Sequence, residues 1–108
     1  MNGSFEIREY VENGRSPFRK WLGDLDEVTA ARVEKYILRL EHGNFGVAKF
    51  LCEGVFELRL DFGPGYRVYF GREGRAIIVL LGGGSKRRQD ADIAAAVERW
   101  KRYKQTRR

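Results

Sequence analysis

Two arginines in neighbouring strand-like segments are the residues of this sequence best suited to chemistry. Arg59 and Arg67 stand on either side of a Gly-Pro-Gly turn, in segments where apolar and polar residues alternate. If these segments pair as antiparallel strands, both arginines lie on one face of the sheet, together with Tyr69. Two guanidinium groups so close together would bind a phosphate, because each offers a fork of donors that matches two phosphate oxygens. Cross-strand pairing with Glu57 and Asp61 is the alternative, and it would contribute only about 0.2–1 kcal/mol per pair.

A run of three glycines, Gly82–Gly84, leads into the cations Lys86, Arg87 and Arg88. Glycines after a strand let the backbone approach a ligand closely, and the cations would then stand at the exit of the strand. The spaced G-x-x-x-x-G-K-[ST] pattern of nucleotide hydrolases is absent, which argues against a nucleotide triphosphatase. A flexible connection with solvated charges is the alternative interpretation of this segment.

The net charge of +6 is concentrated at one end of the chain. Residues 86–108 hold nine Lys and Arg against three Asp and Glu, whereas residues 1–85 hold twelve of each. A basic end of this kind attracts phosphate backbones by releasing their condensed counterions, whatever the nucleic-acid sequence. A solvated basic helix with a frayed tail would have the same composition.

The composition excludes several classes of site. The 108 residues, 43% of them apolar, suit one globular domain over residues 1–108. With one cysteine and one histidine the chain has no internal disulfide and no set of zinc ligands, and we expect no cofactor. We interpret Cys52 as a small core residue and His42 as a cap at the end of a helix. The N-terminus lacks a leader-like pattern and the longest apolar run, Ala76–Leu81, is too short for a bilayer, so we expect a cytoplasmic protein without membrane contact.

Local patterns predict the order strand, helix, helix, three strands as a meander, helix. The first strand covers 5–11; Ser16 and Pro17 begin a helix that Gly23 ends; Asp24 or Asp26 caps a second helix that ends near His42. The meander strands begin near residues 55, 66 and 76. Buried helix positions are expected at Val28, Ala31, Tyr36, Ile37 and Leu40 in the second helix, and at Ile93, Ala96, Val97, Trp100 and Tyr103 in the last. The result is an α+β domain with about four mostly antiparallel strands, helices mainly on one face, and a partly open second face.

The motifs of the C-terminal half closely resemble those of one superfamily. They are Phe56-Glu57-Leu58-Arg59-Leu60, the stretch 62–70, and Leu80–Gly84 followed by Lys86, Gln89, Asp90, Asp92, Ile93 and Ala96. In this order they resemble the RelE/ParE toxin superfamily, and more narrowly the HigB-like addiction module killer proteins of bacterial toxin–antitoxin modules. The resemblance implies a RelE-like fold and a small basic endoribonuclease that cleaves mRNA on the ribosome. It also implies a partner, a small antitoxin of the helix-turn-helix type encoded beside the toxin.

The resemblance also assigns roles to residues. Arg59, Arg67 and Lys86 would form the catalytic set, with the arginines stabilising charge on the phosphorane and Lys86 acting as a further cation or base. Residues Arg87, Arg88, Tyr69, Arg99 and Arg102 would bind RNA. The tyrosine or histidine that many RelE-type enzymes carry near the C-terminus has no clear equivalent, because Tyr103 falls on the apolar arc of the last helix. Two alternatives remain, a ParE-like toxin that inhibits DNA gyrase without nuclease activity and a nucleic-acid-binding domain without turnover.

Overall fold

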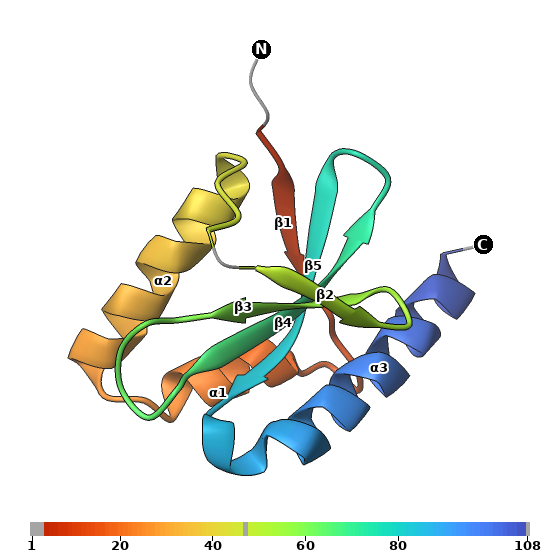
Figure 1. The fold of residues 1–108 in the computed structure, drawn as a ribbon. Helices are drawn as coiled ribbons and strands as arrows, with labels where there is room; N and C mark the ends of the chain where they lie inside the picture. Colours follow the sequence, from red (N-terminus) through yellow and green to blue (C-terminus); the bar gives the residue numbers. More distant parts are fainter. Residues whose placement is uncertain (1–3, 47, 108) are drawn as a thin grey trace.

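The computed structural model describes residues 4–46 and 48–107, which form five strands and three α-helices around one sheet (Figure 1). In chain order the elements are β1 (Glu6–Glu9), α1 (Pro17–Gly23), α2 (Glu27–Glu41), β2 (Lys49–Cys52), β3 (Val55–Arg59), β4 (Arg67–Glu73), β5 (Ile77–Gly84), a 3-10 turn (Lys86–Arg88) and α3 (Gln89–Thr106). This is the α+β domain, with two N-terminal helices and one C-terminal helix, that the sequence predicts.

The sheet has the order β1-β5-β4-β3-β2. β2 to β5 form an antiparallel meander, and β1 closes the other edge by pairing parallel to β5. β2 is a strand that the local patterns do not predict. Its residues do not alternate between apolar and polar, because an edge strand that is largely exposed on both sides buries neither face. The sheet therefore has five strands rather than about four.

Capping residues fix the starts of both N-terminal helices. The Ser16 hydroxyl accepts a hydrogen bond from the Arg19 amide at 3.0 Å, and Pro17 occupies the first turn of α1. The Asp26 carboxylate accepts one from the Thr29 amide at 3.1 Å at the start of α2. Of the two aspartates that could form the second cap, the structure has Asp26. His42 lies at the C-terminal cap of α2, which confirms that prediction.

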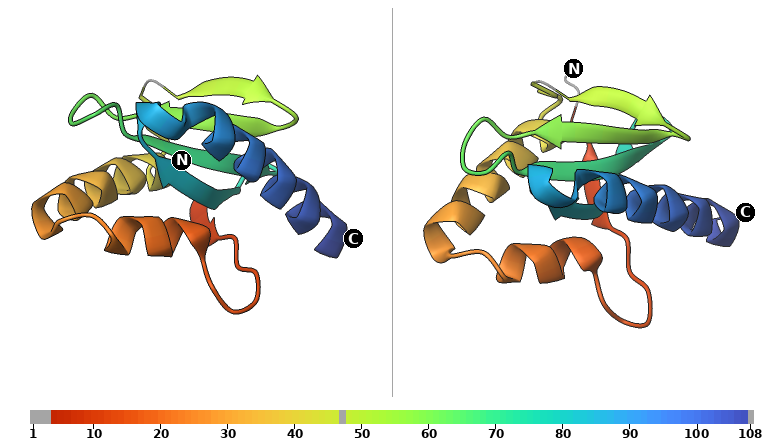
Figure 2. Two further views of the ribbon diagram at one scale, coloured as in Figure 1. Left: turned by 90° about the horizontal axis from the view of Figure 1, so that it is seen from below. Right: turned by 60° about the horizontal axis from the view of Figure 1, so that its bottom comes forward.

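Helices cover both faces of the sheet (Figure 2). α1 and α2 pack on one face over a core that includes Leu58, Val68 and Leu80, and α3 packs on the other face over Tyr69, Val79 and Leu81. The expectation of a partly open second face is therefore wrong. Alternation within a strand identifies two faces, but it does not show that the last helix returns across the second one.

Three predicted core positions are also wrong. Val28 is 71% exposed and Ala31 is exposed as well, and Val33 further along α2 is buried instead. Cys52 lies exposed on the edge strand β2 rather than in the core. None of the helices in the described part of the chain combines the length and apolar character needed to cross a bilayer.

Candidate functional site

The three cations of the expected catalytic set come from segments that meet at one end of the sheet. Arg59 and Arg67 are direct cross-strand partners in the β3–β4 pair, which confirms the predicted register. Arg67 is in turn opposite Gly84 of β5, two residues before Lys86. The Lys86 amide donates a hydrogen bond to the Pro64 carbonyl at 3.2 Å, so the start of the 3-10 turn lies against the β3–β4 turn.

Gly65 is the point where these segments touch. Its φ of +72° belongs to the left-handed region, which favours glycine. A Cβ at this position would lie 2.9 Å from Nη1 of Arg67 and 3.1 Å from Cβ of Lys86. Only a residue without a side chain therefore lets Arg67 and Lys86 approach the turn so closely.

Arg67 lies in a buried polar cluster rather than on an open surface. It is 4% exposed, and Nε lies 3.4 Å from Oε2 of Glu57, which is 1% exposed. Gln89 at the start of α3 donates to the same carboxylate oxygen at 2.9 Å, and Nη1 of Arg67 donates to the Gly65 carbonyl at 2.6 Å. Of the two interpretations of the arginine pair, Arg67 shows the ion pair, with Glu57 as its partner. Asp61, the other acid considered as a partner, accepts a hydrogen bond from Tyr36 instead. Arg67 is not available to a phosphate in this structure.

Tyr69 is buried beneath α3. It is 1% exposed, so it offers no surface to RNA in this structure, and its hydroxyl forms no hydrogen bond with any described residue. Burial raises the pKa of this hydroxyl, and the charges of Glu57 and Asp92 add to that shift. A phenol in these surroundings stays protonated at neutral pH, and its hydroxyl is buried away from solvent.

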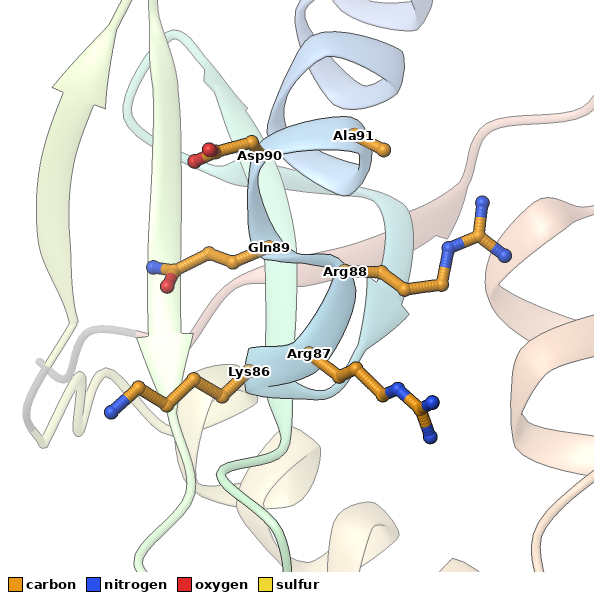
Figure 3. A pocket seen from close by; sticks show the side chains of 6 residues that line it. All are labelled: Lys86, Arg87, Arg88, Gln89, Asp90 and Ala91. Atoms are coloured by element: carbon orange, nitrogen blue, oxygen red, sulfur yellow. The ribbon is translucent and has the colours of Figure 1, made fainter.

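Four cations at this end of the molecule remain exposed, namely Arg59, Lys86, Arg87 and Arg88. None of them forms an ion pair with a residue that the structure describes. Arg59 borders a hollow together with Asp61, Phe62 and the turn glycines. Lys86 and Gln89 extend to one side of the 3-10 turn, whereas Arg87 and Arg88 extend to the other (Figure 3). The basic end therefore presents two cationic surfaces rather than one.

Comparison with known proteins finds a relative that covers most of this chain. No family model matches the chain. An uncharacterized protein of Haemophilus influenzae is 45% identical over 80 residues, which span 73% of this chain and 81% of that protein. This chain belongs to its family. Because the relative is uncharacterized, it carries no activity over to this chain.

The glycine run Gly82–Gly84 of this chain lies within β5 and is not a flexible connection. Each glycine leaves room for a side chain of the protein itself. A Cβ would lie 2.3 Å from the Trp21 ring at Gly83, 2.7 Å from Nη1 of Arg99 at Gly82, and 1.9 Å from the Asp92 carboxylate at Gly84. The expectation that these glycines bring the backbone to a ligand is wrong, because helices on both faces occupy the space.

The two arginines of α3 that are expected to bind RNA differ in their surroundings. Arg99 is half-buried and donates from Nη1 to the Leu81 carbonyl at 2.9 Å. Arg102 is exposed and pairs with Glu12 at 3.1 Å and with Glu98 at 3.5 Å. Trp100 and Tyr103 pack in the core with their rings stacked, 5.4 Å between centroids, as predicted.

Gln89 and Glu57 belong to the site, although sequence reasoning did not place Gln89 there and treated Glu57 only as one of two acids. The alternation that put Arg59 and Arg67 on one face puts Glu57 there too, and Gln89 belongs to the motif that carries the family resemblance. Among the described residues, no three His, Cys, Asp or Glu side chains gather closely enough to hold a metal ion.

Proposed function

We propose that this chain is the toxin of a type II toxin–antitoxin module, a RelE-like endoribonuclease that cleaves mRNA on the ribosome without a metal and so inhibits translation. The observation that carries the proposal is the meeting of Arg59, Arg67 and Lys86 at one end of the sheet. These are the three positions that the motif aligns with the working residues of the toxins. A domain of about 12.5 kDa with a net charge of +6 is also suited to a polyanionic substrate.

The geometry suggests different roles for the three cations. Arg59 and Lys86 are exposed, so they are able to contact the scissile phosphate and stabilise the charge that builds on it. Arg67, balanced by Glu57, binds the Gly65 carbonyl and thereby holds the turn against which Lys86 packs. Arg67 then acts as a positioning residue, and the contact to phosphate is made by its two neighbours.

The burial of Arg67 and Tyr69 favours a second candidate. It leaves the exposed surface rich in cations but poor in groups that transfer protons, which suits a ParE-like toxin that inhibits DNA gyrase through protein contacts. For that function the exposed cations would be incidental, and replacing Arg59 would leave the toxicity intact.

One experiment separates the two candidates. The chain is induced in a bacterium and the 5′ ends of mRNA are mapped for the wild type, Arg59→Ala, Lys86→Ala and the control Arg75→Ala. Arg75 is an exposed cation just before β5, at the end of that strand opposite to Lys86. We expect new 5′ ends in the wild type and in the control. In Arg59→Ala and Lys86→Ala the frequency of these new ends should fall by about a hundredfold or more. Growth arrest with supercoiling defects and no new ends would contradict the nuclease and favour the gyrase inhibitor.

The proposed partner is a small helix-turn-helix antitoxin encoded by the adjacent gene. Coexpression of that gene should abolish growth arrest, and the two chains should copurify. Arrest that persists despite equal expression of the neighbour would contradict the pairing.

A further inference from the structure

A second basic hollow lies between α1 and α3, apart from the three cations of the proposed site. Its lining comes from the 12–17 segment, from Lys20 of α1 and from Arg99 of α3. Its volume of about 510 Å³ lies in the range of ligand sites, about 300–1,000 Å³. A hollow of this size is larger than one inorganic anion requires.

A tight turn gives the hollow a fixed rim. Glu12 and Arg15 exchange backbone hydrogen bonds of 2.9 and 3.0 Å across Asn13 and Gly14. Both central residues have positive φ, 54° and 76°, as in the two-residue turns that asparagine and glycine favour. Arg15 therefore projects from a rigid turn, and ordering it on a ligand costs little backbone entropy.

The charges in the hollow are mostly positive and only partly compensated. Arg15 is exposed and forms no ion pair with a described residue. Lys20 pairs with Asp24 at 3.3 Å, with both side chains more than two-thirds exposed, and such a pair is weak. Glu12 is already engaged by Arg102 and by the Tyr10 hydroxyl. Arg99 contributes a guanidinium anchored to Leu81.

Positive side chains connect the hollow with the basic 3-10 turn at the start of α3. Asp92 and Arg99 are seven residues apart, which places them on one side of α3, and Arg88 directly precedes that helix as its N-terminal cap residue. Arg88 extends from the 3-10 turn to the side on which α1 lies in the close view (Figure 3). Arg88 and Arg99 are about 16 Å apart along the helix axis at about 1.5 Å of rise per residue. The Asp92 carboxylate between them is half-buried against Gly84, so it interrupts the positive surface only in part.

We propose that this groove, defined by Arg15, Lys20, Arg88 and Arg99, carries the sugar-phosphate backbone of single-stranded RNA away from the Lys86 end. The lining of the hollow between α1 and α3 has Pro17 as its only apolar member, whereas the centre of a protein–protein interface is typically apolar. The guanidinium forks, the Asn13 amide and the Ser16 hydroxyl match phosphate and ribose oxygens. The proposal rests on the proposed function in one respect, since it takes RNA to be the substrate.

The test measures salt-dependent binding of a short 2′-O-methyl RNA of mixed sequence, which lacks the hydroxyl needed for cleavage. The variant is Arg15→Glu/Lys20→Glu, and the control is Lys35→Glu/Arg75→Glu, which changes the net charge equally at exposed positions outside the groove. In the groove variant we expect the slope of log affinity against log salt to become shallower by about 1.4, about 0.7 for each phosphate that is no longer neutralised. The control should keep the wild-type slope. The neutral variant Arg15→Gln/Lys20→Gln should show the same decrease, and thermal unfolding checks that each variant is folded.

Equal changes in groove and control variants would overturn the groove, because only net charge would then matter. Unchanged slopes in all variants, together with cleavage of mRNA in cells, would overturn the groove and leave the nuclease intact. A wild-type chain that neither binds the RNA nor cleaves mRNA would overturn both proposals. A groove variant that binds RNA normally but binds poly-glutamate more weakly than the wild type would overturn the RNA path and assign the hollow to an acidic protein.

Discussion

The sheet face under α1 and α2 is closed by apolar side chains, whereas the face under α3 changes along its length from apolar to ionic. Around Trp100 the second face packs like the first, with Val79, Leu81 and Ala96 fully covered. Near the start of α3 it holds Glu57 and Arg67, the only charged side chains buried in the described part of the chain. Buried ion pairs are costly to form and stabilise little against apolar replacements. The difference indicates that the apolar parts of both faces support the fold and that the ionic end holds the β3–β4 turn and Lys86 in place.

Removing one partner of the buried pair should have the largest effect. Glu57→Ala leaves the Arg67 guanidinium buried without a counter-charge, and we expect the free energy of unfolding to fall by about 3–5 kcal/mol in urea titrations. The double variant Glu57→Leu/Arg67→Met should recover most of this stability, because no unpaired charge remains. A double variant as unstable as the single one would show that the pair itself, rather than its neutrality, stabilises the second face.

Adding a methyl group to either face should have an intermediate effect. Gly83→Ala would press on the Trp21 ring at 2.3 Å and Gly71→Ala on the Trp100 ring at 2.6 Å. Overpacking of this kind costs about 1–3 kcal/mol, measured as a lower midpoint of chemical unfolding. Gly23→Ala is the control, because nothing lies within 4 Å of its new Cβ and its φ is ordinary. A larger destabilisation at Gly71 than at Gly83 would show that the second face is the tighter one.

Removing the hydroxyl of Tyr69 should change stability little. A buried hydroxyl without a partner costs free energy, so Tyr69→Phe should unfold within about 1 kcal/mol of the wild type. Calorimetry provides the measurement, with Tyr103→Phe for comparison, because the Tyr103 hydroxyl donates to Glu73 at 2.7 Å. A marked destabilisation in Tyr69→Phe would reveal a hydrogen bond at the ionic end.

The smallest effects should come from two carboxyl groups with opposite pH behaviour. The Tyr103 hydroxyl, and then Arg107, lower the pKa of Glu73, so its contribution is present above the ordinary value of 4.5 and is lost as pH falls through the folded pKa. Burial raises the pKa of Asp92, so its ionisation opposes folding: the penalty grows as pH rises from the ordinary value of 3.8 and is complete above the folded pKa. At pH 7 we expect Glu73→Gln to lower the midpoint of thermal unfolding and Asp92→Asn to raise it. Both differences from the wild-type midpoint should become small at pH 3. Midpoints that shift in the same direction in the two variants at pH 7 would contradict the expected contrast.

Local signals predict the parts of the fold that depend on neighbours in sequence. Ser16, Pro17 and Asp26 fix helix starts through contacts within three residues, and the Gly-Pro-Gly turn fixes the register of Arg59 and Arg67. The failures depend mainly on distant partners. Whether α3 crosses the second face is decided by packing between residues far apart in sequence, and so is the covering of Tyr69.

The same reason explains why only part of the site is predictable. Alternation gives Arg59 and Arg67 one face, but it does not show that their surroundings differ: Gln89 of α3 bonds to Glu57 beside the buried Arg67, while Arg59 stays exposed at the strand end. The Gly82–Gly84 run is ambiguous because a glycine marks either a mobile backbone or a space for another side chain. Its own neighbours in sequence do not distinguish the two.

The seating of Trp21 over Gly83 has an evolutionary consequence. Trp21 lies in α1 and Gly83 in β5, and the space left by the missing side chain of Gly83 is filled by the Trp21 ring. In an alignment of descendants of a common ancestor, a larger residue at 83 should be accompanied by a smaller one at 21, and the same covariation should link 71 with 100.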